Sequence, residues 1–410
     1  MKIMVLNSGS SSLRFQLIET SPEQIEKHAD RVLGTGMVEK IGTGEAIVAY
    51  QALGAPRVKT SREILEHRQA VNAALACVTG SDGGVVAGPD EIEGVGHRVV
   101  HGGERFGASA LMTDEVVRQV EDAIELAPLH NPHNLKGFYA AREVLPRAKQ
   151  VAVFDTAFHH TLPRHAFLYG LPYALYPRHG LRRYGFHGTS HRYLAYRYAR
   201  IHGKPKDAFK LITCHLGNGC SVCAIDHGRS IDTSMGFTPL EGLLMGTRAG
   251  DVDVAAVLHV MAKEELTLHE VSSLLNKHSG LYGVSGISND MRELLKEREN
   301  GNDRAALAID IFCYRLKKYI GSYFAALNGV DAVIFAGGIG ERAPAIRAQI
   351  CASLGAIGIE IDPDKNNAAD AVEANISAPG ASTPVWVIPT NEELLIARDT
   401  LRCILGIPHP

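Results

Sequence analysis

The stretch Ile3-Met4-Val5-Leu6-Asn7-Ser8-Gly9-Ser10-Ser11-Ser12 decides the fold of this chain. Its four apolar residues predict a buried strand, and the small polar residues after them predict a turn. The chain then returns through Leu13-Arg14-Phe15-Gln16-Leu17-Ile18, so the whole segment predicts a β-hairpin. Glycine lets the backbone approach a ligand closely, and successive N–H groups in a turn form a concave site for an anion.

The same pattern returns two hundred residues later. Leu211-Ile212-Thr213-Cys214 leads into His215-Leu216-Gly217-Asn218-Gly219, and the chain returns from Cys220 to Asp226. Two such turns on two related domains can hold a polyphosphate from both sides. No Gly-x-x-x-x-Gly-Lys-Ser/Thr occurs, which excludes the P-loop class. We therefore predict an ATP-dependent phosphotransferase without a P-loop.

Size and composition indicate a globular protein of two domains. The chain has 410 residues, of which 45% are hydrophobic and 21% charged. A net charge of −3 provides no general attraction to nucleic acid or to anionic membranes, and no apolar run approaches the roughly 20 residues of a membrane span. Seven scattered cysteines suggest a reducing cytoplasm rather than a disulfide framework. Cys220-x-x-Cys223 has no second pair, so a metal or redox role for it is a minor alternative.

Helix-like and strand-like runs alternate, which is typical of an α/β fold. Thr113 caps a predicted helix that ends at Pro128, and the segment from Arg164 to Tyr184 lacks periodicity and suits a mobile flap. Further predicted elements are helices at 254–275, 304–327 and 391–401 and strands at 150–154 and 332–336. We expect the first domain to comprise 1–155 plus 390–410, and the second 156–389.

Two arginines lie in glycine-flanked, otherwise apolar segments. Arg98 lies within Gly96-His97-Arg98-Val99-Val100-His101-Gly102-Gly103, and Arg248 within Met245-Gly246-Thr247-Arg248-Ala249-Gly250. Guanidinium groups bind carboxylate and phosphate oxygens bidentately, so the two suggest an anion clamp. The alternatives are a core ion pair for Arg98 and a solvated surface position for Arg248.

Two further residues are candidates for chemistry. Asp155 directly follows a strand, at the carboxyl end where open α/β sheets place ligands. Its alternative role is that of a helix N-cap. His187 lies within Gly185-Phe186-His187-Gly188, where the glycines permit close approach to a ligand, although a lone histidine is more often structural.

The C-terminal Thr390-Asn391-Glu392-Glu393 predicts a helix start. Thr390 as N-cap and Glu393 three residues later would form a capping box. Glu392 would then have no capping role and would be available to a metal ion.

One glycine motif weakly favours a different class of protein, the dinucleotide-binding enzymes. The strand at 332–336 precedes Gly338-x-Gly340-x-x-Ala343, with Glu360 about twenty residues on, as in dinucleotide-binding folds. It occurs late in the chain and no second Rossmann half follows. Glycines that let adenosine lie against the backbone explain it equally well.

Taken together, these residues identify a family. The chain resembles the acetate kinase family over its whole length, from Asn7-Ser-Gly-Ser-Ser-Ser to Asn391-Glu392-Glu393. Matching stretches between them begin at His97, Ala127, Phe154, Tyr184, His215 and Gly246. The resemblance implies duplicated ribonuclease-H-like domains, as in actin and sugar kinases, with ATP in an interdomain cleft. It also implies a homodimer formed mainly through the second domain.

The resemblance further implies reversible transfer of the ATP γ-phosphoryl group to acetate, in line and without a phosphoenzyme. Acetate is ionised at pH 7, so it needs no general base. Arg98 would bind its carboxylate, whereas Arg248, His187 and Asn218 would hold the phosphoryl group in transfer. Mg²⁺, for which Mn²⁺ can substitute, would be held by Asn7 and Glu392 with Asp155 positioning it.

The remaining implied roles concern the acyl group and the nucleotide. The methyl pocket would be formed by Val100, Leu129, Phe186 and Pro239, with His130 beside the substrate. The nucleotide would contact Ser10, Ser12, Arg14, 215–219, Asp290, Met291, Arg292, Gly337, Gly338, Ile339, Gly340 and Glu341. Arg14 stands where the family usually has Lys, which keeps the charge but changes its geometry.

Two alternative functions remain open at this point. A propionate kinase differs from an acetate kinase by room for one methylene, and Val100 would control that room. An actin-like assembly ATPase would need neither the paired arginines nor an apolar pocket.

Overall fold

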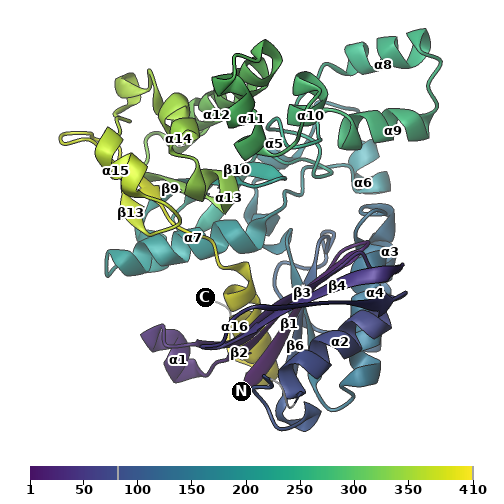
Figure 1. Ribbon diagram of the computed structural model, residues 1–410. Coiled ribbons are helices and arrows are strands. Elements are labelled where there is room, and N and C mark those ends of the chain that lie inside the picture. Colours follow the sequence, from purple (N-terminus) through teal and green to yellow (C-terminus); the bar gives the residue numbers. More distant parts are fainter. Residues whose placement is uncertain (81–82, 409–410) are drawn as a thin grey trace. The chain divides into compact units, whose positions relative to one another are not determined.

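The computed structural model describes residues 1–80 and 83–408, and it divides into two compact units. Unit 1 comprises Met1–Ala157 and Asn391–Pro410, and unit 2 comprises Phe158–Thr390. Each unit is built around one mixed β-sheet covered by helices (Figure 1). Within the described residues no helix has the length and apolar character that a membrane crossing requires.

The sheet of unit 1 has the strand order β5-β4-β3-β2-β1-β6-β8-β7. Strands β1 to β5 form an antiparallel meander, β1, β6 and β8 run parallel, and short β7 is antiparallel to β8. The strands are β1 (Lys2–Ser8), β2 (Ser12–Glu19), β3 (Arg31–Glu39), β4 (Thr43–Ala52), β5 (Val58–Ile64), β6 (Gly94–Val99), β7 (Ala110–Leu111) and β8 (Lys149–Phe154).

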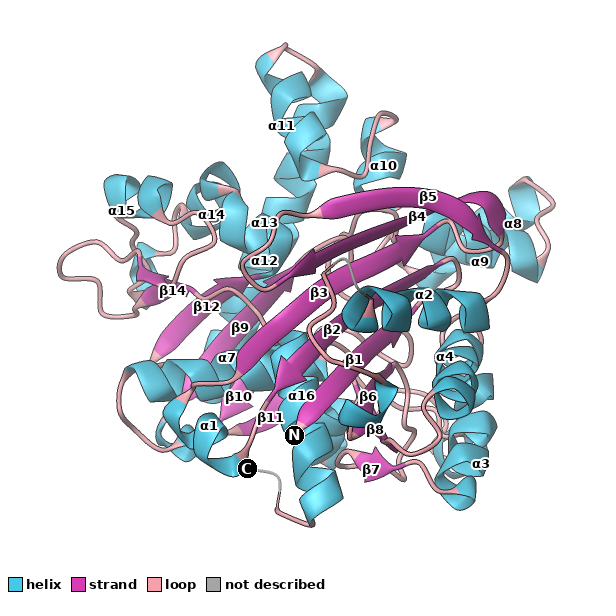
Figure 2. Ribbon diagram, turned by 60° about the horizontal axis from the view of Figure 1, so that its bottom comes forward, coloured by secondary structure: helices cyan, strands magenta, loops and turns pink. Residues whose placement is uncertain are grey.

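The sheet of unit 2 repeats the central part of this order, as β11-β10-β9-β12-β14-β13. Strands β9, β10 and β11 are antiparallel, and β9, β12 and β14 run parallel (Figure 2, magenta). The strands are β9 (Lys210–Leu216), β10 (Cys220–Asp226), β11 (Arg229–Thr233), β12 (Ala332–Ala336), β13 (Ala374–Asn375) and β14 (Val385–Val387). The shared order confirms the predicted duplicated ribonuclease-H-like fold, and both predicted hairpins are present.

The helices of unit 1 cover both faces of its sheet. They are α1 (Pro22–Lys27), α2 (His67–Thr79), α3 (Asp114–Asp122), α4 (Asn131–Val144) and α16 (Glu392–Leu405). Those of unit 2 are α5 (Arg164–Phe167), α6 (Leu175–His179), α7 (Gly188–Ile201), α8 (Val254–Lys263), α9 (Leu268–Lys277), α10 (Gly280–Ser285), α11 (Met291–Glu299), α12 (Asp303–Leu327), α13 (Gly337–Arg342), α14 (Pro344–Cys351) and α15 (Pro363–Ala368).

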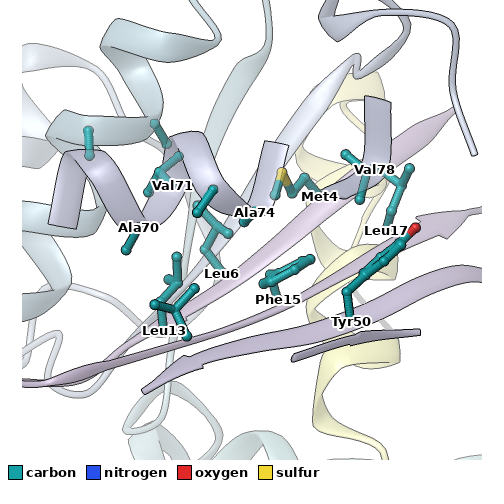
Figure 3. Packing of buried hydrophobic residues seen from close by; sticks show 14 of the residues in the cluster. Met4, Leu6, Leu13, Phe15, Leu17, Tyr50, Ala70, Val71, Ala74 and Val78 are labelled. Carbon is teal, nitrogen blue, oxygen red and sulfur yellow. The ribbon is translucent and has the colours of Figure 1, made fainter. Parts of the chain in front are cut away.

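Burial on both faces explains why β1 is apolar without alternation. Met4 and Leu6 pack toward α2, whose Ala70, Val71, Ala74 and Val78 repeat at helical spacing (Figure 3). On the opposite face, Ile3 and Val5 pack against Ile396 and Ala397 of α16. A strand covered on both faces has no solvated side that would need polar residues. This double burial orients the turn at residues 9–11.

Three predicted helices differ in detail from the structure. The run 254–275 is not one helix: α8 ends at Lys263, and Thr267 starts α9 with a capping box to Glu270. Thr113 caps α3 as predicted, but the α-helix ends at Asp122 and a 3₁₀ turn follows. The C-terminal helix extends to Leu405. The segment 164–184 contains only the short helices α5 and α6.

Candidate active site

Three candidate residues of unit 1 meet at one edge of its sheet. Asn7 lies near the end of β1, Arg98 near the end of β6, and Asp155 directly after β8. The three strands are parallel neighbours, so their carboxyl ends lie at the same edge. Helix α16 packs on this sheet and supplies Glu392 from its first turn (Figure 1, yellow).

Arg98 and Asp155 form a bidentate ion pair. Arg98 Nε lies 3.0 Å from Oδ1 and Nη2 lies 2.6 Å from Oδ2, and the Asp155 side chain is 1% exposed. This is the alternative that the sequence left open for Arg98, and it also replaces the capping alternative for Asp155. Burial alone would lower the pKa of Arg98, but the charges of Asp155 and Glu392 raise it above its ordinary value. Among the described residues Arg98 Nη1 makes no hydrogen bond, so it can still bind an anion.

Glu392 extends this pair into a charged cluster. Its Oε2 lies 4.0 Å from Arg98 Nε. Burial raises the pKa of Glu392 to about 7, and the charges of Asp155 and Glu393 add to the rise, although Arg98 opposes it. Burial and the neighbouring carboxylates both disfavour the charged form of Glu392, and a nearby cation would favour it.

The predicted capping box is wrong. Asn391 is the N-cap of α16, and its Oδ1 accepts from Leu394 N at 3.0 Å. Thr390 instead donates its N–H to Glu341 Oε1 at 3.1 Å, and its hydroxyl pairs with Ser190. Asparagine and threonine are both good caps, so local sequence could not decide between them. Neither glutamate therefore has a capping role.

The chain after β6 is held by two buried asparagines of α4. Asn134 Oδ1 accepts from Val100 N at 3.0 Å, and its Nδ2 donates to Ser8 O at 2.9 Å. Asn131 binds both backbone groups of His101. The buried Val100 is thereby tied to the first turn. His130 stands just before α4, and the neighbouring Leu129 is exposed.

The first glycine-serine turn has the expected hairpin geometry. Gly9 N donates to Ser12 O at 2.8 Å, and Asn7 pairs across the hairpin with Arg14. Ser10 and Arg14 are exposed, and Ser12 is half-buried. Arg14 is close enough to lower the pKa of Glu392, so it belongs to the same cluster of charges.

In unit 2, His187 and Arg248 converge on the second glycine turn. A Cβ placed on Gly219 would lie 3.3 Å from Arg248 Nη1 and 3.4 Å from His187 Nε2. Any side chain at this position would crowd both groups, so glycine is needed where His187 and Arg248 approach the turn. The family resemblance had implied that both residues act with Asn218 of this turn, and the structure brings their side chains to Gly219.

The loop that carries Arg248 is itself fixed by glycines. Arg248 Nη1 donates to Pro239 O at 3.2 Å, which replaces the alternative of a solvated surface arginine. A Cβ on Gly280 would lie 2.8 Å from Arg248 N, and one on Gly246 would lie 2.0 Å from Asn218 Oδ1. Asn218 Oδ1 also accepts from Asn289 at 3.0 Å. Asn218, Pro239 and Arg248 thus form one packed group.

His187 starts α7 in a left-handed backbone conformation, with φ 55°. Its Nδ1 lies 2.8 Å from Ser221 Oγ, and its ring lies 4.3 Å from the ring of His215. The preceding Phe186 is buried, and its carbonyl lies 3.0 Å from His159 Nε2. These contacts give His187 a defined orientation, which argues against a merely incidental histidine.

The glycine segment after β12 forms helix α13, from Gly337 to Arg342. Gly337 has φ 74°, and its N–H donates to Glu341 Oε1 at 2.9 Å. A Cβ on Gly338 would meet open space, so the helix start is accessible. These glycines follow a strand of the repeated ribonuclease-H-like sheet. They therefore need not be explained as the glycine motif of a dinucleotide-binding fold.

Other predicted nucleotide residues lie near the start of α11. Asp290 is its N-cap, and its carboxylate is paired with the exposed Arg292. Met291 is buried. The Asp290 carboxylate caps α11 and pairs with Arg292. Arg292 would therefore have to move before a ligand could bind this carboxylate.

Sequence reasoning overlooked the polar residues that support these groups. Ser221, His191 and Thr213 form a buried chain behind His187, and Glu341 joins Gly337 to Thr390. The sequence separation of four residues between His187 and His191 was the one local signal that the two histidines could lie close together. Nothing local indicated that Ser221 and Thr213 would meet them.

No metal cluster of three or more His, Cys, Asp or Glu side chains occurs within 1–80 and 83–408. Burial raises the pKa of the Cys220 thiol to about 12 and that of Cys223 higher still. Such thiols are poor metal ligands and nucleophiles at neutral pH. The metal or redox alternative for this pair is therefore unfavourable.

Comparison with known proteins identifies the family of this chain. The model of the acetokinase family matches residues 2–398. An acetate kinase of Solibacter usitatus (strain Ellin6076) is 54% identical, with all of both chains covered. The crystal structure of Porphyromonas gingivalis acetate kinase has a TM-score of 0.92 at 44% identity and covers 98% of this chain and 99% of its own. A propionate kinase structure from Francisella tularensis has a TM-score of 0.90 at 38% identity, covering 99% and 100%. The chain therefore belongs to the acetokinase family.

Proposed function

We propose that this protein is an acetate kinase, which transfers the ATP γ-phosphoryl group reversibly to acetate to give acetyl phosphate and ADP. The observation that carries the proposal is the convergence of His187 Nε2 and Arg248 Nη1 on Gly219 of a phosphate turn. Two donors at that distance suit a transferring phosphoryl group, whose charge lies on its equatorial oxygens. Family membership and relatives named acetate kinase support it.

Acetate would bind at Arg98. Its Nη1 remains available, while Asp155 holds the rest of the guanidinium in a fixed plane. The ion pair thus orients the donor before substrate arrives. Asp155 need not act as a base, because acetate with a pKa of roughly 4–5 is already ionised at neutral pH. The acetate oxygen attacks the γ-phosphorus as the bond to the ADP oxygen breaks, and no proton is moved.

Arg248, His187 and Asn218 would stabilise the phosphoryl group in transfer. All three are packed against fixed partners, namely Pro239 O, Ser221 and Gly246. Donors that are positioned in advance need no reorganisation as charge develops. Direct in-line transfer is the simplest chemistry for this set, since the nucleophile is supplied by the substrate.

Mg²⁺ fits the oxygen groups of unit 1. Mg²⁺ is commonly held by one or two carboxylates together with substrate phosphates and water, so a full protein cage is not needed. Glu392 and Asn7 would hold it, and the negative charges of Asp155 and Glu393 near Glu392 support a cation at this position. When bound, the ion neutralises phosphate charge; Mn²⁺ has similar ligand preferences.

ATP would lie on the glycine segments of unit 2. The accessible start of α13 at Gly338 suits adenosine, and the turn at 217–219 suits the phosphates. Ser10, Ser12 and Arg14 of unit 1 would approach the phosphates when the enzyme closes. Arg14 offers a planar fork in place of the usual lysine.

The test is an acetyl-phosphate assay with ATP and Mg²⁺. Acetate-dependent hydroxamate formation is expected, with ADP released in equal amount. Hydrolysis of ATP without dependence on acetate would favour an assembly ATPase instead. Comparing acetate, propionate and butyrate by kcat/KM separates the acetate and propionate kinase alternatives, the second of which the Francisella tularensis relative favours.

We also propose a homodimer formed through unit 2. Helix α8 has apolar residues around its surface but buries none of them: Val254, Leu258 and Val260 are 70%, 60% and 38% exposed. Leu268 of α9 is 78% exposed. Apolar surface of this kind is typical of an interface. Light scattering, which measures molar mass in solution, tests this proposal. The wild-type protein should be a dimer, and the Leu258→Glu variant should be a monomer because a charge at the interface would disfavour association.

None of the seven cysteines, which all lie within the described residues, forms a disulfide. A reducing compartment keeps thiols in this state, and we accordingly place the enzyme in the cytoplasm. Fractionation of cells that express the tagged chain would test this assignment.

A further inference from the structure

A buried polar chain lies behind His187 and ends at Thr213. His187 Nδ1 lies 2.8 Å from Ser221 Oγ, and Ser221 Oγ lies 2.8 Å from His191 Nε2. His191 Nδ1 lies 2.7 Å from Thr213 Oγ1. Thr213, Ser221 and His191 are all 0% exposed, so bulk solvent does not reach their polar atoms.

Three elements of unit 2 build this chain. His187 is the N-cap of α7, and His191 follows four residues later within the helix. Ser221 of β10 lies directly opposite His215 of β9, and Thr213 lies two residues before His215, so all three side chains are on one face of the sheet. The register of this hairpin therefore aligns the hydroxyls with the histidines.

The number of hydrogens on these side chains determines which atom donates in each of the hydrogen bonds. Burial, with the nearby His159 and His215, holds the pKa of His191 well below its ordinary value, so His191 is neutral and carries one N–H. Among the described residues the Thr213 hydroxyl has His191 Nδ1 as its only side-chain partner. If His191 Nδ1 carried the hydrogen, the buried Thr213 hydroxyl hydrogen would have no acceptor, which is unfavourable.

The arrangement that satisfies every group is unique. Thr213 donates to His191 Nδ1, His191 Nε2–H donates to Ser221, and Ser221 donates to His187 Nδ1. From this geometry we infer that Thr213, His191 and Ser221 are positioning residues that keep His187 in the tautomer with its hydrogen on Nε2. That nitrogen is the one beside Gly219 and Arg248.

The consequence rests on the proposed phosphoryl transfer. A neutral His187 with Nε2–H donates a hydrogen bond to a phosphoryl oxygen without first taking up a proton. The other neutral tautomer would present a lone pair to that oxygen and repel it. The chain thus acts as the third group of a catalytic triad does, by selecting a tautomer rather than by moving a proton.

The first test is the ¹⁵N spectrum of the histidine-labelled wild-type protein, with His187 assigned through His187→Gln. We expect an unprotonated Nδ1 and a protonated Nε2 at neutral pH. A protonated Nδ1 would overturn the inference without reference to activity. The measurement therefore stays decisive even if the wild-type protein fails to phosphorylate acetate, which would refute only the proposed function.

The second test compares Thr213→Val with Thr213→Ser. Valine keeps the shape but removes the hydroxyl donor. We therefore expect kcat to fall by about 10- to 100-fold, as when other groups that orient a functional histidine are removed. The His187 Nδ1 signal should move toward the protonated position, while the KM for acetate, which we assign to Arg98, stays unchanged. Serine should restore both the spectrum and kcat. A valine variant with wild-type spectrum and kcat would contradict the inference.

Discussion

Arg98 Nη2 lies 2.6 Å from Asp155 Oδ2, and Asp155 is almost completely buried. The arginine that should bind acetate is thus also the counter-ion of a buried carboxylate. The two duties are compatible because a guanidinium has five donors and this pair uses only one side of the fork. They also mean that stability and catalysis are linked at Arg98.

Replacing Arg98 should therefore affect both properties. Arg98→Met leaves Asp155 buried without a partner, and we expect a loss of about 3–5 kcal/mol in the free energy of unfolding. Turnover should fall by at least about 100-fold, the effect of losing one preorganised donor. The double variant Arg98→Met with Asp155→Asn should recover stability but not turnover. Denaturant unfolding and the hydroxamate assay separate the two effects; recovered turnover in the double variant would remove Arg98 from the substrate site.

The two adjacent glutamates of α16 should differ in their effect on metal dependence. Glu392→Gln removes the carboxylate that lies 4.0 Å from Arg98, and we expect the Mg²⁺ concentration for half-maximal rate to rise at least about tenfold. Glu393→Gln should change it little. Because Asn391 is the cap, neither change should unfold the helix, whereas Asn391→Ala should cost about 1 kcal/mol. Equal metal requirements for the two glutamine variants would refute this division.

Val100 should control acyl length. Val100→Ala removes two methyl groups but keeps the backbone bond to Asn134, so the loop should stay in place. We expect the kcat/KM ratio of propionate to acetate to rise by roughly 10-fold or more, since one methylene is worth about 1–3 kcal/mol. Val100→Ile is the matched control and should lower the ratio. An unchanged ratio in both variants would place Val100 outside the pocket.

Acid should destabilise the protein through its buried histidines. Burial lowers the pKa of His97 to about 4, where its Nε2 lies 2.7 Å from Gln150. The unfolded state, with a pKa near 6.5, binds the proton first, so stability falls as the pH drops from about 6.5 to 4. His97 alone should contribute on the order of 3 kcal/mol at the acid end.

The matched variant for this effect is His97→Gln. It cannot titrate, so its free energy of unfolding should depend on pH by almost one proton less between pH 6.5 and 4. Urea unfolding at several pH values measures the slope. An identical slope in both proteins would show that folding does not lower the pKa of His97.

We predict that the two units close on nucleotide, because the phosphate turns at 7–12 and 217–219 belong to different units. The hinge should lie near Asp155 and Pro389, where the chain passes between them. Closure would shield the reaction from water. Paired labels on the two units, measured with and without Mg·ADP and a planar phosphoryl mimic, test this. A distance distribution that does not contract would indicate a preformed closed state.

The hydrophobic periodicity of the sequence predicted those helices and strands that depend on residues close together in the chain. Both predicted hairpins are present, and β12 and α12 were found at the predicted residues within one position. The prediction of a single helix from 254 to 275 was wrong. The hydrophobic spacing continues across a break, where the Thr267–Glu270 capping box starts a new helix. The start of α16 failed for a related reason, since two adjacent residues could each act as the cap.

The sequence by itself determined the two hairpins, because buried apolar strands and glycine turns are local signals. Its motifs carried the family resemblance, which implied the duplicated fold and the chemistry-bearing residues. Only the tertiary structure decided their partners. Arg98 with Asp155, Arg248 with Pro239 and Thr213 with His191 are separated in sequence by 57, 9 and 22 residues. Such pairs depend on strand register and loop paths, and hydrogen bonding in a buried site is directional, so their geometry follows from packing and not from spacing along the chain.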